Sequence, residues 1–265
     1  MVKEALEIMH QEGHKQLTIG SCCLEEYKKT LPKGQYDKIY PDMYDIPLDP
    51  KYGSPNVGEY IRNSYRGGWC YVVEGKERTV FHEGVTADVN SLYPSMMSSE
   101  SGNRYPIGKP TFWSGDFIPD EALDPHHYYF IRIRTRFYIK DGYLPFMQVK
   151  SSLLYPMNTM LKTSDVYDRQ SGEYLKYIIG TDGELKETDV ILTLTMTDWI
   201  LFKEHYKLVD CEILDGCWFE TGIGLFDDYI EKYKKIKQNS TGAQRELAKL
   251  FLNNLYGKMA SNKRS

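Results

Sequence analysis

The chain has 265 residues, of which 41% are hydrophobic and 26% charged, so it is long enough to form one large domain or two ordinary ones with a packed core. This composition excludes an intrinsically disordered chain. The formal net charge of −4 argues against a uniformly basic nucleic-acid-binding protein.

The cysteines and the apolar runs narrow the class of protein further. Five cysteines without a Cys-x-x-Cys pair argue against a disulfide framework and favour a reducing compartment. His10 and His14 have helical i, i+4 spacing near Cys22 and Cys23, so a zinc site is an alternative, although adjacent cysteines have poor ligand geometry. No apolar run reaches the ~18 residues of a membrane span, and we expect no membrane partner.

The N-terminal segment predicts short helices and a connector. Apolar residues at helical spacing predict a helix over residues 2–12 that stops near Gly13. A second short helix is predicted to begin at the cap Ser21. Residues 29–52 are rich in Pro, Asp and Lys and predict an irregular connector.

The next segment predicts a helix followed by two strands. Ser54 is a candidate cap and Pro55 suits the first helical position, whereas Gly67 and Gly68 would end this helix. Residues 69–75 and 83–89 then predict two strands joined by a turn.

The rest of the chain alternates strands and helices. Residues 128–139 alternate apolar residues with Arg and predict a half-buried strand, and residues 190–206 predict a strand followed by a helix. Residues 225–237 predict a helix that is interrupted at 238–242, and residues 243–259 predict the strongest helix of the chain. Mixed strands and segregated helices of this kind favour an α+β fold.

The positive charge is concentrated at the C-terminal end. Residues 231–265 carry nine Lys or Arg and two acidic residues, which gives +7 and leaves −11 on the rest of the chain. A basic segment on an acidic body favours a local anion site. The ordinary alternative for such a run of charge is a solvated helix face.

Asp88 comes at the end of a predicted strand. Strand alternation places Thr86, Asp88 and Asn90 on one face and leaves the Asp88 carboxylate outside the core. The other face, expected to enter the core, carries Val85, Ala87 and Val89. A turn follows at Pro94. A carboxylate in this position can hold a hard cation such as Mg²⁺ with positions open for phosphate, or it can simply form a turn or a helix cap.

The strongest predicted helix has two different faces. A turn of 100° per residue places Lys249, Asn253 and Tyr256 on one side. The opposite side is apolar: Leu247, Leu250, Phe251 and Leu255. A lysine followed two turns later on the same face by a tyrosine suits a helix lying along a nucleoside triphosphate. A solvated face of an amphipathic helix is the alternative.

Three motifs in this order resemble those of the family B DNA polymerases. The residues DVNSLYPS (88–95) are similar to motif A, KLFLNNLYGK (249–258) to motif B, and YRGG (65–68) to the YxGG motif between the exonuclease and polymerisation domains. The family form of motif B usually has Asn-Ser where this chain has Asn253-Asn254. The long segment between motifs A and B resembles the terminal-protein region of the protein-primed branch in phages and mobile elements. The resemblance covers essentially the whole chain.

This resemblance implies a partial polymerase palm, an inserted α/β subdomain and a helical fingers hairpin. Residues 1–28 would be the tail of an exonuclease domain and residues 29–99 part of the palm. Residues 100–224 would be the terminal-protein-region insertion and residues 225–265 the fingers.

The resemblance also implies roles for the matching residues. Asp88, with the Val89 carbonyl, would bind the catalytic metals, Mg²⁺ or Mn²⁺. Other matching residues would bind the deoxynucleoside triphosphate: Val89, Leu92, Tyr93, Lys237, Lys249, Asn253 and Tyr256. The Tyr93 ring would lie under the sugar and exclude a 2′-hydroxyl. A third group would bind primer-template DNA: Tyr65, Gly67, Gly68, Ser91 and Lys258.

The 265 residues do not contain a motif C, Tyr-x-Asp-Thr-Asp-Ser, which supplies the second metal-binding carboxylate in this family. We therefore expect an internal fragment of a protein-primed DNA polymerase, inactive by itself and located in the cytoplasm of a host cell if viral. Its partners would be primer-template DNA, deoxynucleoside triphosphates and a terminal protein. A non-enzymatic module that binds DNA, nucleotide or a priming protein is the alternative.

Overall fold

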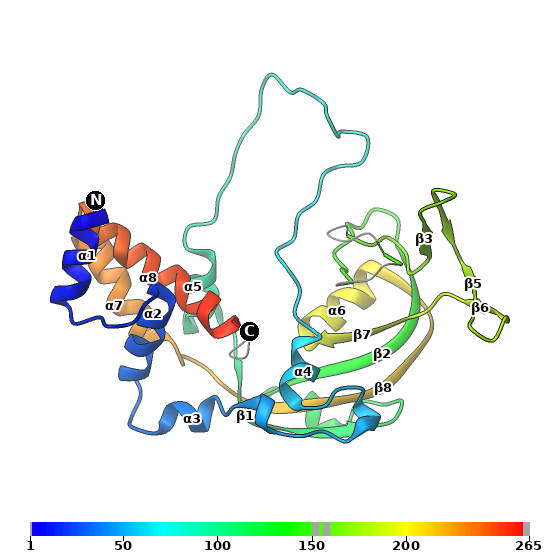
Figure 1. Ribbon diagram of the computed structural model, residues 1–265, viewed down its shortest axis with the longest axis horizontal. Coiled ribbons are helices and arrows are strands. Elements are labelled where there is room, and N and C mark those ends of the chain that lie inside the picture. The colour runs from blue at the N-terminus through cyan, green and yellow to red at the C-terminus, as the bar shows by residue number, and fades with distance from the viewer. Residues whose placement is uncertain (1, 150–153, 156–159, 262–265) are drawn as a thin grey trace. The chain divides into compact units, whose positions relative to one another are not determined.

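The computed structural model describes residues 2–149, 154–155 and 160–261, and they form two compact units (Figure 1). Unit 1 comprises Met1–Pro41, Glu83–Gly108 and Glu220–Ser265, and unit 2 comprises Asp42–His82 and Lys109–Phe219. Both units are therefore built from segments far apart in the sequence. They cut across the predicted domain ranges 1–28, 29–99, 100–224 and 225–265, whose assignments stay predictions.

Unit 1 is helical. Its longer helices are α1 (Val2–Gln11), α2 (Ile19–Lys29), α7 (Asp227–Asn239) and α8 (Gly242–Ala260), and its shorter ones are α3 (Gln35–Ile39), α5 (Leu92–Met97) and the 3-10 turn η3 (Ser99–Ser101). Helices α2, α7 and α8 pack around one apolar core that contains Tyr27, Tyr229 and Phe251. This core also takes Met97 of α5, so the segment after Asp88 is anchored in the same unit.

Polar contacts reinforce the packing of unit 1. Glu26 of α2 is 8% exposed and accepts hydrogen bonds from Lys29 and from Lys232 of α7. At the other end of α7, the Asp227 carboxylate accepts a 2.9 Å hydrogen bond from the backbone amide of Ser99, directly after α5. Helix α7 is thus tied to α2 and to the segment that carries the predicted motif A.

Unit 2 is built around an antiparallel sheet. Strands follow the order β1 (Tyr105–Ser114), β8 (Tyr206–Gly222), β2 (His127–Ile139) and β7 (Val190–Thr195), and β1 and β8 contain residues of both units. Helix α6 (Met196–His205) packs on β2 and β7 (Figure 1). Two small hairpins pair β3 (Val166–Asp168) with β4 (Glu173–Leu175) and β5 (Tyr177–Ile179) with β6 (Leu185–Glu187). The short helices are α4 (Val57–Arg62), η1 (Met43–Asp45), η2 (Pro50–Tyr52) and η4 (Asp120–Leu123).

The alternation of β2 sorts its side chains between two faces. Ile131 and Ile133 are fully buried and lie opposite Leu194 and Leu192 of β7, in the core covered by α6. The arginines between them lie on the other face and meet acidic residues of β8, in the pairs Arg132–Asp215, Arg134–Glu212 and Arg136–Asp210. The predicted half-buried strand is confirmed, and its arginines form a row of ion pairs.

The pair Arg132–Asp215 is the most buried of this row. Asp215 is 2% exposed, and both of its carboxylate oxygens accept hydrogen bonds from Arg132 Nε at 3.1 Å. The Tyr60 hydroxyl donates to Asp215 Oδ1 at 2.8 Å, and burial raises the pKa of this tyrosine well above its ordinary value. Tyr60 belongs to α4, so the network joins α4 to the sheet.

Several predictions of local structure are confirmed and two strands are not. The helices at the N- and C-terminal ends and the strand and helix over 190–206 form as predicted. Residues 69–75 and 83–89 have irregular backbone, because no described strand pairs with them. Val85 and Val89, predicted to enter the core, are 98% and 59% exposed.

Smaller differences concern caps, helix faces and unpredicted strands. Thr18 rather than Ser21 caps α2, and Asn56 rather than Ser54 caps α4, in each case by accepting a backbone hydrogen bond. Leu250, predicted to be buried, is 40% exposed. The connector 29–52 contains α3 and two 3-10 turns, and the long strands β1 and β8 were not predicted.

Replacing Asp215 with Ala is expected to destabilise unit 2 by about 3–5 kcal/mol, because Arg132 would keep a buried charge without its partner. All four tryptophans lie in unit 2, so their fluorescence during urea unfolding reports on this unit. The matched control is Glu212→Ala, which removes a half-exposed carboxylate 3.6 Å from Arg134 and is expected to cost at most about 1 kcal/mol. Equal losses for the two variants would contradict the importance of the buried pair.

Candidate nucleotide-binding site

The segment that resembles motif A ends in an exposed turn. Asp88 and Val89 are exposed, and Ser91 has a left-handed backbone (φ 52°), which is uncommon for a residue with a side chain. Helix α5 begins directly after it, at Leu92. Strained backbone of this kind is enriched at functional sites, where the surrounding structure must hold it in place.

Two contacts hold the turn. The backbone amide of Ser95 donates to the Ser91 carbonyl at 2.9 Å, and Lys237 of α7 donates to the Ser91 hydroxyl at 3.3 Å. Pro94 and Met97 are buried on the other side of α5. The ammonium group of Lys237, predicted to hold phosphate, therefore lies directly at the motif A turn.

Tyr93 of motif A stacks on Tyr256 of motif B. The ring centroids are 4.3 Å apart and the planes differ by 14°. Tyr93 keeps 46% of its surface exposed, and Tyr256 is half-buried. The predicted sugar-contacting ring and the predicted base-contacting ring are thus neighbours, although they are 163 positions apart in the sequence.

Helix α8 presents the remaining motif B side chains. Lys249 and Asn253 are exposed on one side, whereas Leu247, Phe251 and Leu255 are buried on the other. Asn254, which departs from the usual family residue, donates its side-chain amide to the Leu250 carbonyl of the same helix at 2.8 Å. The departure is accommodated within α8 itself.

The residues predicted to contact DNA are distributed over both units. Tyr65, Gly67 and Gly68 belong to unit 2, and the Arg62 guanidinium lies 5.4 Å from the centre of the Tyr65 ring. Ser91 and Lys258 belong to unit 1. The stem of Lys258 packs beside Gly20 of α2, where an added Cβ would lie 3.4 Å from it.

Of the motif residues, Asp88 offers a carboxylate to a divalent cation. Within the ranges that the structure describes, no three His, Cys, Asp or Glu side chains gather as a metal site. The oxygens of the Asp88 carboxylate and the Val89 carbonyl are the hard ligands that Mg²⁺ prefers. The zinc alternative has no such support: Cys22 and Cys23 are buried in the core of unit 1, and burial raises the pKa of the Cys23 thiol to about 11.

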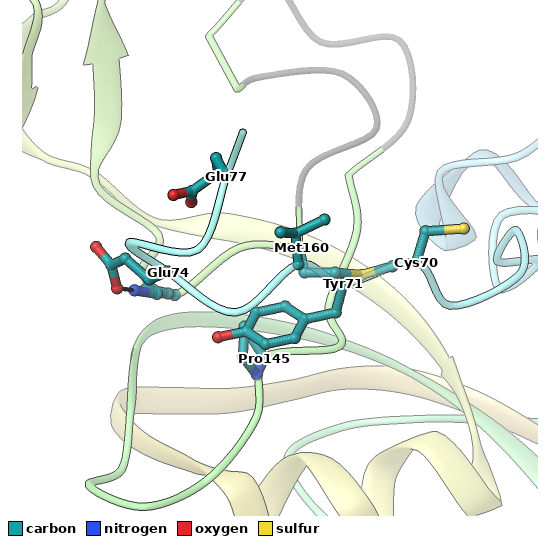
Figure 2. A pocket seen from close by; sticks show the side chains of 8 residues that line it. Cys70, Tyr71, Glu74, Glu77, Pro145 and Met160 are labelled. Carbon is teal, nitrogen blue, oxygen red and sulfur yellow. Dashed lines mark hydrogen bonds and ion pairs between the residues drawn. The ribbon is translucent and has the colours of Figure 1, made fainter. Parts of the chain in front are cut away.

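Unit 2 contains a pocket of about 450 Å³ beside the loop that follows YRGG (Figure 2). The loop is attached by Trp69, which stacks on Tyr71 and donates its indole N–H to the Pro145 carbonyl at 3.0 Å. Glu74 and Glu77 line the pocket, and Glu74 pairs with Lys162. Two carboxylates against one ammonium group make this pocket unsuitable for phosphate.

Comparison with known proteins identifies the family. The sequence model described as "DNA polymerase type B, organellar and viral" matches residues 2–265. This chain belongs to the organellar and viral type B DNA polymerases. The resemblance found from motifs A and B is therefore confirmed. Every helix among the described residues is too short or too polar to span a membrane.

Individual relatives agree with this membership. The chain is 34% identical over 262 residues to the DNA polymerases of Bacillus phages Nf and phi29, which covers 99% of this chain and 39% of each relative. A solved structure of phi29 DNA polymerase, described as complexed with primer-template DNA and incoming nucleotide substrates, matches with a TM-score of 0.75 and 34% identity over 98% of this chain. These matches confirm the α+β fold class. The chain spans about two fifths of the length of these relatives.

A double-mutant cycle tests the contact between Tyr93 and Tyr256. We expect Tyr93→Ala and Tyr256→Ala to be coupled by about 0.5–1.5 kcal/mol, as for other stacked aromatic pairs. Hydrogen exchange of the amides of α8 reports the local stability of unit 1, where there is no tryptophan. The control cycle combines Tyr93→Ala with Asn253→Ala, an exposed residue of the same helix, and should be additive within about 0.5 kcal/mol. A Tyr93–Tyr256 coupling no larger than this control would argue against the stack.

Proposed function

We propose that this chain is part of a DNA-directed DNA polymerase and supplies the side chains that bind the incoming deoxynucleoside triphosphate. The observation that carries the proposal is the meeting of motifs A and B within unit 1. Tyr93 stacks on Tyr256, and Lys237 donates to Ser91, so the groups for sugar, base and phosphate come together without unit 2.

Different side chains of the site would contact the triphosphate, the base and the sugar of the nucleotide. The ammonium groups of Lys237 and Lys249 would neutralise the triphosphate and donate charge-assisted hydrogen bonds to it. Asn253 and the Tyr256 ring, one turn apart on α8, would lie against the base pair being formed. The flat Tyr93 ring would contact a deoxyribose and collide with a 2′-hydroxyl, so that it selects the sugar by repulsion.

The metal part of the proposal rests on Asp88. Its carboxylate and the Val89 carbonyl would hold Mg²⁺ or Mn²⁺, which supplies Lewis-acid activation of the phosphoryl group when bound. The exposure of Asp88 leaves its oxygens open to an ion carried in with the triphosphate. A two-metal centre requires a further carboxylate, and the described residues contain no group of three His, Cys, Asp or Glu side chains that could hold a metal.

Partners are proposed by analogy with the relatives. The matched phi29 structure contains primer-template DNA and incoming nucleotides, which supports the same ligands here, with Tyr65, Gly67, Gly68, Ser91 and Lys258 as DNA contacts. We also propose protein-primed replication, with a terminal protein bound at the insertion 100–224. The proposed location is the cytoplasm of the host cell.

Triphosphate binding should depend on Lys237 and Lys249. The double variant Lys237→Ala with Lys249→Ala is expected to weaken binding of a fluorescent deoxynucleoside triphosphate by at least about tenfold, since a hydrogen bond to a charged group contributes roughly 1.5–3 kcal/mol. Lys3→Ala with Lys235→Ala is the matched control. It removes the same charge from two exposed i, i+4 ion pairs of unit 1 and should change binding less than about threefold. Equal losses of affinity in the two double variants would mean that net charge alone weakens binding, and would argue against the site.

Residues 1–265 by themselves are expected not to extend a primer. The physical reason is that a single motif carboxylate, Asp88, cannot clamp two cations about 4 Å apart. The measurement incubates the chain with primer-template, deoxynucleotides and Mg²⁺ or Mn²⁺, with Asp88→Ala as the paired control. Extension by the wild-type chain that Asp88→Ala abolishes would overturn this prediction, whereas nucleotide binding without extension would agree with it.

A further inference from the structure

A second pocket of unit 2, of about 390 Å³, is lined by three arginines from three different segments. Arg62 ends α4, Arg66 follows it in the YRGG segment, and Arg132 lies on β2. The other described lining residues are neutral, and there is no Asp or Glu among them. This composition distinguishes it from the pocket of Figure 2, which Glu74 and Glu77 line. We call it the arginine pocket.

The sheet fixes one wall of the arginine pocket. Arg132 lies opposite Thr193 of β7, and Ile191 shares the face of Thr193, two residues away on the same strand. Leu192 and Leu194, between and beside them, are buried in the core on the other face. Arg132, Ile191 and Thr193 on the exposed face of β2 and β7 thus form this wall, together with Leu192 between the two β7 residues.

Arg132 is held rigidly before any ligand arrives. Besides its bonds to Asp215, its Nη2 donates to the Lys51 carbonyl at 2.8 Å. Gly53 has a left-handed backbone (φ 67°), and a Cβ there would lie 2.3 Å from Arg132 Nη1. The chain thus has a glycine where its backbone approaches this guanidinium closely, so that Nη1 fits beside it without a clash.

Arg66 is held by backbone oxygens. Its Nη1 donates to the Asn63 carbonyl and its Nη2 to the Thr193 carbonyl, both at 2.9 Å. Its Nε is buried and has no hydrogen-bond partner among the described residues. Burial lowers the pKa of Arg66 and raises that of the nearby Asp198, so this guanidinium is poorly solvated and incompletely paired.

We propose that the arginine pocket binds a phosphate group. Arg132 Nε and Nη2 are already bonded to Asp215, so the donors that remain for a phosphate are Arg132 Nη1 and the second hydrogens of the Arg66 Nη1 and Nη2 groups. These charged donors are fixed in position, and the described lining carries no carboxylate to repel a phosphate. A bound anion would also offset the burial of Arg66. The phosphate belongs either to a DNA backbone or to a free nucleotide. This inference adds a phosphate subsite to the proposed polymerase function and rests on that function only for the source of the phosphate.

The test places a charge in the pocket without touching an arginine. Ile191 is 52% exposed at the pocket wall, so Ile191→Glu adds a carboxylate there and Ile191→Gln adds a neutral side chain of the same length. Ile200 of α6 is also 52% exposed and does not line the pocket, so Ile200→Glu is the matched control for net charge. Neither position contributes to the hydrogen bonds that hold Arg66 or Arg132.

The probes are pyrophosphate, a single-stranded oligodeoxynucleotide and a deoxynucleoside triphosphate. Thermal unfolding followed by tryptophan fluorescence reports on unit 2 alone, and the stabilisation rises with ligand concentration over its dissociation constant. We expect pyrophosphate to stabilise the wild type more than chloride at equal ionic strength. Ile191→Glu should raise the pyrophosphate concentration needed for a given stabilisation by at least about threefold. For Ile191→Gln and Ile200→Glu this concentration should stay within about twofold of the wild-type value.

The other two probes identify the source. Protection by the oligonucleotide at lower phosphate concentration than by the triphosphate assigns the pocket to a DNA backbone, and the reverse order assigns it to a nucleotide. Equal responses of Ile191→Glu and Ile200→Glu, or no protection by any of the three compounds, would overturn the arginine pocket as a phosphate site. The proposed function fails separately, through triphosphate binding that is insensitive to Lys237 and Lys249 of unit 1.

Discussion

The candidate nucleotide site depends on the burial of one face of α8. Phe251 and Leu255 are almost fully buried in the core shared with α2 and α7, and Leu247 is buried on the same side of the helix. This burial fixes the rotation of α8 about its axis. Because the rotation is fixed, Lys249 and Asn253 must face outward, and Tyr256 must lie at the edge of the buried stripe, where it meets Tyr93. A hydrophobic stripe therefore determines where the polar groups of motif B lie.

In unit 2 the two-residue periodicity of a strand determines where the charged side chains lie. The two-residue repeat of β2 buries Ile131 and Ile133 and leaves Arg132, Arg134 and Arg136 on the opposite face. Three acidic residues of β8 pair with these arginines: Asp210, Glu212 and Asp215. Three of the 37 Asp and Glu residues of the chain are thus paired within the sheet. The distribution of charge, and not the net value of −4, decides where local positive sites form.

Sequence reasoning was accurate where a segment's own periodicity decides its structure. The helices α7 and α8, the strand β2 and the pair β7–α6 all follow from apolar residues at helical or strand spacing. It was wrong for residues 69–75 and 83–89, which alternate like strands but have no described strand to pair with. Periodicity predicts a face that could be buried, whereas a strand also requires a partner for its backbone hydrogen bonds.

The residue types of the candidate site could be predicted from the sequence, whereas the contacts between these residues could not. Motifs A and B identified Asp88, Tyr93, Lys249 and Tyr256 as candidate site residues from local sequence alone. The left-handed backbone of Ser91 could not be predicted from the sequence, because serine rarely adopts it and only the contacts around it can enforce it. The hydrogen bond from Lys237 to Ser91 joins residues that no local pattern relates.

The two units show how one chain can separate two kinds of positive site. In unit 1 the lysines stand on helices whose opposite faces are buried, so their ammonium groups stay hydrated and can adapt to a ligand. In unit 2 the arginines are fixed by Asp215, by carbonyl oxygens and by the close approach of Gly53. The incoming triphosphate proposed for unit 1 suits the first arrangement, because flexible donors can adapt to it. A phosphate that only has to be held in position suits the second, since rigid donors lose less entropy when they bind.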